Sequence, residues 1–387
     1  MRTARRAAEI EPFEVMDVLS RAQALERAGR HMVHMEIGEP DFTAPAPVVE
    51  AGVRALRDGR TAYTATLGLN SLREAIGAHY RSRFRVEVPA SRIAITAGAS
   101  GGLLCVTALY VDAGDEILVP DPGYPGYRHF VRAFEGVAKT LPVSAATDFQ
   151  PTLEMVRKAW GPRTKGLLLG SPSNPTGTLI SKDELARIAA FIAEREGVLM
   201  VDEIYQGLVY GRAASTVLEL ADDVFVIASF SKYFNMTGWR LGWIVAPEPY
   251  VREIEKLAQN LFISPSTIAQ HAALACFEPA TLEIVEARRR ELDERRRFLI
   301  PALEGLGFRV PVVPQGAFYI YADSSALAPD SFALARSILT DAGVAVTPGK
   351  DFGRHEPERH IRIAYTQTVA RLEEAVARIR SLLERKT

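Results

Sequence analysis

The sequence predicts an α/β protein with a mainly parallel sheet covered by helices and a smaller α+β domain. Short apolar runs alternate with helix-length segments in the middle of the chain, and the last third mixes short strands with helices. The runs are apolar throughout, which is typical of parallel strands buried on both faces. Because 387 residues exceed the usual size of one core, we expect a large domain over residues 45–285 and a small domain from residues 1–44 plus 286–387.

The expected strands of the large domain are RIAIT (92–96), EILVP (116–120), KGLLLG (165–170), GVLMVD (197–202), VFVIAS (224–229) and LGWIVA (241–246). Helix-length segments at 99–111, 124–134 and 181–195 lie between several of them. The loop between the last two strands is too short for a helical crossover, so we expect that pair to be antiparallel.

A long helix is expected over residues 279–305, and its many charged residues are expected to form a solvated face. The runs FRVPVV, GAFYIYAD, VAVTPG and HIRIAYT then predict short strands, and a helix is expected over residues 368–385. We expect these elements, together with the N-terminal segment, to form the small domain.

Composition excludes several classes of protein. The formal net charge of -1 gives no reason to expect a nucleic-acid or membrane partner, and no apolar run approaches the roughly 20 residues of a membrane span. The N-terminus has arginines but no apolar core of a secretory signal, and it is expected to form an exposed first helix. Cys105 and Cys276 lie in apolar helical contexts. They predict core thiols in a reducing, cytoplasmic compartment and no metal site.

Polar residues follow several strands at the edge where ligands bind in parallel α/β sheets. A small-residue turn, AGASGG, opens a helix after RIAIT, and the other strand ends are followed by Asn174, Asp202, Tyr205, Ser229, Ser231 and Lys232. Each has a simple structural explanation: packing at a helix start, a turn former, an N-cap or a surface lysine. Their occurrence together at four strand ends favours a binding site.

The chemistry of this set matches one cofactor. Amides at a helix N-terminus, with Ser100, Ser229 and Arg240, suit a phosphate. A desolvated lysine such as Lys232 can form an imine with an aldehyde. Asp202 can hold a ring nitrogen protonated. Tyr205 and Asn174 can hydrogen-bond a phenolate on the same ring, which together describes pyridoxal 5'-phosphate (PLP).

The ordered motifs resemble one family, the class I/II aminotransferases of the aspartate aminotransferase type (PLP fold type I). These motifs are YTATLGLNSLREA, DPGYPGY, SPSNPTG, VDEIY, SFSKYFNMTGWRLGW, GAFY and HIRIAY. The resemblance runs from about residue 30 to 385. It implies a seven-stranded main sheet, PLP as cofactor and a homodimer with a shared active site.

Roles are carried over residue by residue. Lys232 matches the Schiff-base lysine and general base, Asp202 the pyridinium partner, and Tyr205 and Asn174 the residues bonding the phenolate oxygen. The phosphate residues implied are Gly98, Ala99, Ser100, Ser229 and Arg240, while Tyr124 matches a ring stacked on the cofactor, often tryptophan in aspartate-specific members. Tyr63 matches a tyrosine supplied by the neighbouring subunit, although Tyr63 and Tyr124 could also be plain core or interface aromatics.

The implied substrate residues are Arg362, which would clamp the α-carboxylate, together with Gly38 and Asn174. An arginine between two isoleucines in HIRIAY could also point to solvent. No arginine stands at a family-matched position that would commit the pocket to a dicarboxylate. Members acting on aspartate, aromatic or small apolar amino acids share the remaining motifs.

The expected reaction is ping-pong transfer of an amino group between an L-amino acid and a 2-oxo acid. A PLP-dependent C–S or β-lyase of the same fold is the alternative. An α/β nucleotide-binding oxidoreductase is disfavoured because no strand–GxGxxG–helix motif is present. A non-catalytic regulatory module is disfavoured because Lys232 is retained and little sequence precedes residue 30 for a DNA-binding domain.

Overall fold

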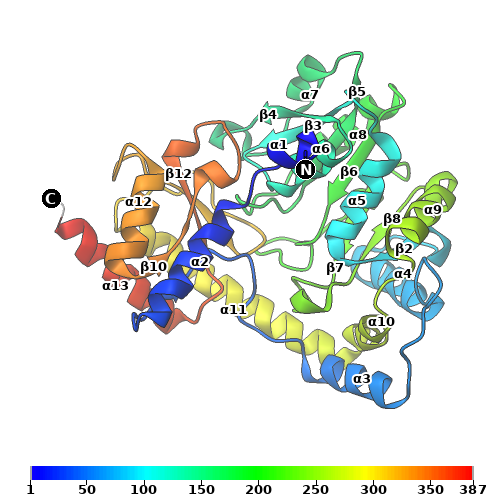
Figure 1. Cartoon of the computed structure of the whole chain (residues 1–387), viewed down its shortest axis with the longest axis horizontal. Helices are drawn as coiled ribbons and strands as arrows, with labels where there is room; N and C mark the ends of the chain where they lie inside the picture. The colour runs from blue at the N-terminus through cyan, green and yellow to red at the C-terminus, as the bar shows by residue number, and fades with distance from the viewer. Residues whose placement is uncertain (1, 386–387) are drawn as a thin grey trace.

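The computed structural model describes residues 2–385 and contains a seven-stranded sheet with the order β2-β8-β7-β6-β5-β3-β4 (Figure 1). Its strands are β2 (Ile93–Thr96), β3 (Glu116–Asp121), β4 (Val137–Pro142), β5 (Thr164–Gly170), β6 (Val198–Asp202), β7 (Phe225–Ser229) and β8 (Gly242–Val245). Only β8 runs antiparallel to its neighbours. The six expected strands, the antiparallel β7–β8 pair and the predicted fold class are confirmed.

The seventh strand, β4, was not among the apolar runs. It lies at the edge of the sheet and pairs only with β3. Most of its residues are exposed or half-buried, and Lys139 in its centre donates to Glu116 over 3.1 Å. A half-covered edge strand does not need a continuous apolar sequence, which explains why the pattern did not indicate it.

Helices cover both faces of this sheet, and each face has its own cluster of buried apolar side chains. The helices of this part are α3 (Ala46–Arg57), α4 (Asn70–Phe84), α5 (Gly98–Tyr110), α6 (Gly126–Ala133), α7 (Leu153–Ala159), α8 (Lys182–Ala193), α9 (Val251–Phe262) and α10 (Thr267–Leu274). The three helices expected between strands correspond to α5, α6 and α8. The α5 helix packs on β7 and β8, which places its N-terminus at the edge where β7 ends.

A second group of elements lies beside the main sheet (Figure 1). It contains the antiparallel sheet β11 (Thr347–Pro348), β12 (His360–Ala364) and β9 (Tyr319–Asp323), the parallel pair β1 (Val33–His34) and β10 (Val344–Ala345), and the helices α2 (Glu14–Arg27), α12 (Ser331–Ser337) and α13 (Val369–Glu384). The β1–β10 pair joins the N-terminal segment to the last third of the chain.

The strands expected in GAFYIYAD and HIRIAYT and the helix expected over 368–385 are confirmed as β9, β12 and α13. VAVTPG forms two separate short strands, β10 and β11. The strand expected in FRVPVV is wrong: only Arg309 forms an isolated bridge, with Asp323. Pro311 and Pro314 lack the N–H groups that a longer ladder requires.

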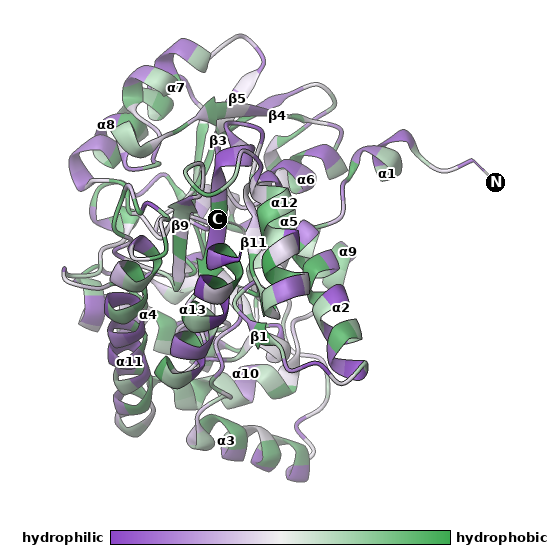
Figure 2. Cartoon of the chain, turned by 90° about the vertical axis from the view of Figure 1, so that its left-hand side faces the viewer, coloured by the Kyte–Doolittle hydropathy of each residue, from purple (hydrophilic) through white to green (hydrophobic). Residues whose placement is uncertain are grey.

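The long helix expected over 279–305 is α11 (Pro279–Glu304), and Figure 2 shows its strongly hydrophilic surface. The expected solvated face is present at exposed positions such as Arg290 and Glu294. The expectation of a solvated side chain is wrong for Arg295, which is buried and makes a bidentate pair with Asp41 over 2.8 and 3.0 Å. This pair ties α11 to the loop after β1.

The N-terminal segment begins with the exposed helix α1 (Arg5–Glu9), as expected, and α1 contacts α6. Cys105 and Cys276 are buried free thiols, also as expected. Among residues 2–385, no helix is both long and apolar enough to cross a membrane.

Candidate active site

Four strand ends meet at one edge of the main sheet, where a cavity of about 280 Å³ opens. Residues of β6, β7 and α5, of the loop that follows β5 and of the second group of elements line it. The lining residues predicted from sequence are Gly38, Ala99, Ser100, Tyr124, Asn174, Asp202, Tyr205, Ser229, Ser231, Lys232, Arg240 and Arg362. The structure therefore brings most of the predicted site together.

Lys232 lies three residues after β7 and is half-buried in this cavity. Its ammonium donates to the carbonyl oxygen of Gly38 over 2.6 Å. Burial lowers the pKa of Lys232 to about 8; Glu39 opposes the shift, while Arg362 and Arg240 add to it. A lysine with this pKa is partly neutral near neutral pH, so it can act as a nucleophile and as a base.

Asp202 ends β6 and is a buried carboxylate. The hydroxyl of Tyr127 donates to its Oδ2 over 2.9 Å, and the backbone N–H of Ile204 donates to its Oδ1 over 3.2 Å. Burial raises the pKa of Asp202 to about 6 in spite of these two donors. Tyr127 is the last residue of the sequence motif DPGYPGY, but nothing in that motif indicated that its hydroxyl would hydrogen-bond to Asp202.

Arg362, on β12, is buried and reaches the cavity rather than solvent, which removes the simple alternative for this arginine. Its Nη1 donates to Asn174 Oδ1 over 3.0 Å, and its Nη2 donates to the carbonyl of Glu36. Its guanidinium lies over the ring of Tyr319, 4.3 Å from the centroid. The Nε atom is buried and has no hydrogen-bond partner among the described residues.

Tyr205 and Tyr319 form a buried pair whose hydroxyl oxygens are 2.9 Å apart. Burial raises the pKa of Tyr205 well above its ordinary value. Tyr319 belongs to the GAFY motif but had no predicted role. It explains Gly38: a Cβ at this position would lie 2.2 Å from the Tyr319 hydroxyl oxygen, so only glycine fits.

The expected phosphate residues surround the N-terminus of α5. Gly98 has φ +68, and a Cβ there would lie 2.7 Å from an Nη atom of Arg240. Only glycine therefore lets this guanidinium approach the start of the helix. Ser229 Oγ donates to Ser231 Oγ over 2.9 Å beside it. Free amides, hydroxyls and a guanidinium at a helix N-terminus form an anion site.

The two remaining predicted aromatics differ in position. Tyr124 lines the cavity, and its ring lies 5.3 Å from that of Tyr127. Tyr63 does not line the cavity of its own chain, and the residue is 80% exposed. The residues that the sequence did not indicate, besides Tyr127 and Tyr319, are Phe13, Val15, Leu103, Pro172 and Ile204.

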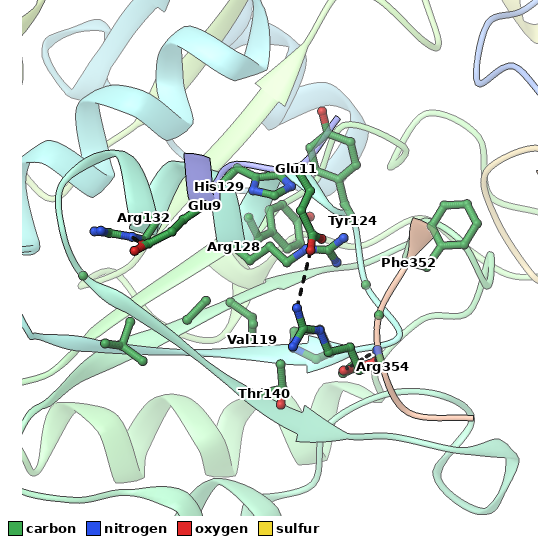
Figure 3. A pocket seen from close by; sticks show the side chains of 18 of the residues that line it. Glu9, Glu11, Val119, Tyr124, Arg128, His129, Arg132, Thr140, Phe352 and Arg354 are labelled. Carbon is green, nitrogen blue, oxygen red and sulfur yellow. Dashed lines mark hydrogen bonds and ion pairs between the residues drawn. The ribbon is translucent and has the colours of Figure 1, made fainter. Parts of the chain in front are cut away.

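A larger hollow of about 840 Å³ adjoins the cavity at Tyr124 and Tyr127 (Figure 3). Its charged side chains include Arg132 and Arg354, which pair with glutamates of the N-terminal segment. It contains neither Lys232 nor Asp202. We therefore place the chemistry in the smaller cavity, where perturbed titratable groups converge.

The residues of the cavity fit PLP. The glycine at position 98 lets the Arg240 guanidinium lie at the N-terminus of α5, where it can pair with a phosphate; Asp202 can hold a protonated ring nitrogen, and Lys232 has a lowered pKa. The unpartnered Nε of Arg362 leaves a donor for a bound anion. The phosphate, the ring nitrogen and the aldehyde of the cofactor therefore each have a chemical counterpart in the cavity.

Comparison with known proteins gives the same assignment. The pattern of the family described as "Aminotransferase class I and II" matches residues 30–379. The chain is 37% identical to a (5-formylfuran-3-yl)methyl phosphate transaminase from Methanocaldococcus jannaschii, covering 98% of this chain and 99% of that protein. It is also 37% identical to a valine–pyruvate aminotransferase from Mycobacterium tuberculosis, covering 97% of each.

A crystal structure of an aminotransferase from Mycobacterium tuberculosis superposes with a TM-score of 0.96 at 36% identity, covering 100% of both chains. Members of this family depend on PLP, and the full-length relatives are named as aminotransferases or transaminases. The chain belongs to the class I and II aminotransferases and is a PLP-dependent enzyme of amino-group transfer.

Proposed function

We propose that the cavity at Lys232 is where this chain transfers an amino group between an L-amino acid and a 2-oxo acid. The observation that supports this most strongly is the position of Lys232, half-buried with a pKa lowered to about 8 and in the same cavity as Asp202 and Arg362. When bound, PLP supplies an aldehyde that joins amino groups covalently and a protonated ring that accepts electron density from the substrate.

Binding of the cofactor is assigned to three sets of residues. The amides of Gly98, Ala99 and Ser100, with Ser229 and Arg240, hold the phosphate. Asp202 keeps the ring nitrogen protonated, while Tyr127 orients its carboxylate through the 2.9 Å hydrogen bond. Tyr205 and Asn174 would donate to the phenolic oxygen, and the Tyr124 ring would pack against the cofactor.

Binding of the substrate is assigned to Arg362, whose planar guanidinium can hold the α-carboxylate with two parallel hydrogen bonds. Tyr319 and the carbonyl of Glu36 already fix the guanidinium in position. With the carboxylate held, Lys232 Nζ removes the proton from the substrate Cα. The lowered pKa of Lys232 supports this role, because a base works best when its pKa is close to the working pH.

A homodimer with a shared site, a cytoplasmic location and the division into domains at residues 45–285 and 1–44 plus 286–387 belong to this proposal. Tyr63 is 80% exposed, and Leu56 and Ile263 are also exposed apolar residues, at 53% and 55%. A second subunit that covered these residues would remove their apolar surface from water, which favours association. The free buried thiols Cys105 and Cys276 suit a reducing compartment.

The test is an amino-transfer assay with 2-oxoglutarate and pyruvate as acceptors, on the wild type and Lys232→Ala. We expect the wild type to form a new amino acid from the acceptor, and the variant to lose more than about 1,000-fold in turnover, since a nucleophile and base are removed together. Release of ammonia, and of pyruvate in reactions that contain 2-oxoglutarate alone, without amino transfer would instead identify a lyase. Wild-type turnover in Lys232→Ala would refute the assignment.

A further inference from the structure

The N-terminal segment contributes part of the cavity wall. Phe13 and Val15, at the start of α2, line the cavity. With the exception of Gly38, every other lining residue lies more than 80 residues further along the sequence. The ring of Phe13 lies 6.1 Å from that of Tyr124, centroid to centroid, and both side chains are half-buried. These two residues have no role in binding the cofactor in the proposed function.

The charges that line the cavity are all used by the proposed function. Its cations are Lys232, Arg240 and Arg362, and its one carboxylate is Asp202. Apart from Ser231, whose hydroxyl accepts from Ser229, the lining that is left over is apolar or aromatic, and it consists of Phe13, Val15, Leu103, Pro172, Ile204 and tyrosines. Within one chain, a second substrate carboxylate would therefore be desolvated without a partner, which is strongly unfavourable.

The start of α2 is held by a residue from elsewhere in the fold. Phe13, the N-cap residue, makes no side-chain capping bond. Instead Asp351, just after β11, accepts a hydrogen bond from the backbone N–H of Glu14 on Oδ1 over 2.8 Å. Asp351 is buried, and a carboxylate at a helix N-terminus is favourably placed for the helix dipole.

Asp351 is fixed in turn by its own surroundings. Arg128 donates from Nη2 to the backbone oxygen of Asp351 over 3.1 Å. Burial raises the pKa of Asp351. The backbone N–H groups of Glu14 and Val15 and the charges of Arg362 and Arg128 lower it, but by less. The carboxylate thus accepts from the first backbone N–H of α2, that of Glu14, and the N–H of Val15 also favours its charged form.

Ion pairs on the surface add further attachments for the same segment. Lys350 pairs with Glu14 over 2.9 Å, and Arg354 pairs with Glu11 over 3.5 Å, as Figure 3 shows for the second pair. Arg354 and Glu11 are mostly exposed, so this pair contributes little. The buried carboxylate of Asp351 is therefore the main attachment of the α2 start.

We propose that Asp351 is a positioning residue that holds Phe13 and Val15 as the wall of a substrate side-chain pocket, and that this pocket selects amino acids with uncharged apolar side chains over aspartate. The inference rests on the proposed function, since it concerns the substrate of the same site. Asp351 acts through the backbone of α2, whereas Phe13 and Val15 contact the substrate.

The first experiment compares leucine, alanine and aspartate as amino donors to the PLP-loaded enzyme, with kcat/KM measured from the optical change of the cofactor. We expect leucine to exceed aspartate by at least about 10-fold in the wild type, which corresponds to about 1.4 kcal/mol. Phe13→Ala should lower kcat/KM for leucine by about 10-fold and for alanine by less than about 3-fold, because only the longer side chain reaches the wall.

Met16→Ala is the matched control, because Met16 lies on the same helix, is 49% exposed and does not line the cavity. We expect it to keep the wild-type ratio of leucine to alanine. Asp351→Ala should shift that ratio in the same direction as Phe13→Ala. Asp351→Asn should restore most of it, since the amide oxygen still accepts from Glu14.

The outcomes separate this inference from the proposed function. Absence of amino transfer from every amino acid would refute the function itself. Amino transfer with aspartate faster than leucine, or an unchanged ratio in Phe13→Ala, would refute the inference alone. A loss of activity in Asp351→Ala that is equal for leucine and alanine would refute positioning. If Asp351→Ala does not fold, the ratio of kcat/KM for leucine to that for alanine in Phe13→Ala and Asp351→Asn still tests the inference.

Discussion

The hydrogen bond between Tyr127 and Asp202 gives a quantitative prediction for Tyr127→Phe. The bond is 2.9 Å long, both residues are buried, and Asp202 has a pKa raised to about 6. At about pH 8 the carboxyl is ionised, and hydrogen bonds to charged groups contribute about 1.5–3 kcal/mol. We therefore expect the variant to lose about 2 kcal/mol of unfolding free energy in the cofactor-free protein.

The sign of the pH dependence follows from that pKa. Below about pH 6 the carboxyl of Asp202 is protonated in the folded protein, so the charge-assisted part of the bond is absent there. The loss should shrink to about 1 kcal/mol or less at about pH 5. In the cofactor-loaded enzyme the same change should slow amino transfer about 10-fold, because the carboxylate loses its orientation toward the ring nitrogen.

The assay is urea unfolding of cofactor-free protein at both pH values and one protein concentration. Tyr210→Phe is the control, because its hydroxyl donates to the neutral carbonyl of Ala317 over 2.6 Å. Its cost should be about 1 kcal/mol at both pH values. Equal losses for Tyr127→Phe at the two pH values, or a loss below about 0.5 kcal/mol at pH 8, would refute the reasoning.

Two further substitutions test the substrate and phosphate sites. Arg362→Lys should raise KM for the amino acid and lower kcat/KM about 100-fold, since a lysine cannot replace the two parallel hydrogen bonds. Steady-state kinetics measure both constants, and an unchanged KM would contradict the assignment of Arg362 to the substrate carboxylate. Gly98→Ala places a Cβ 2.7 Å from Arg240 at φ +68 and should weaken PLP retention about 10-fold in dialysis, whereas Gly238→Ala, with open space around it, should not.

The main sheet could be predicted because its interior strands are uniformly apolar. β5, β6 and β7 are buried along their length, apart from Lys165, so their sequences had to be apolar on both faces. β4 was not predicted because an edge strand with exposed and half-buried residues, such as Lys139, needs no such pattern. FRVPVV was wrongly predicted because its β-branched residues favour strands locally, while Pro311 within it and Pro314 after it lack the N–H groups of a ladder.

The site divides in a similar way. Lys232 and Asp202 could be found because they follow apolar strands directly, and the family motifs added Arg362 and Tyr124. Tyr319 and Tyr127 were inside quoted motifs, but their partners come from distant segments that no local pattern identifies. Asp351 holds the helix start beside Phe13 through a hydrogen bond to Glu14, and these two bonded residues are 337 positions apart in the sequence. Only the tertiary structure shows such a contact.

The central claim is that the side chain of Lys232 joins the cofactor covalently. Borohydride reduction of the PLP-loaded enzyme, followed by peptide mass spectrometry, tests this directly. We expect a pyridoxyl group on Lys232 and loss of amino transfer in proportion to labelling. Unlabelled Lys232, or a label on another lysine such as Lys350, would contradict the account.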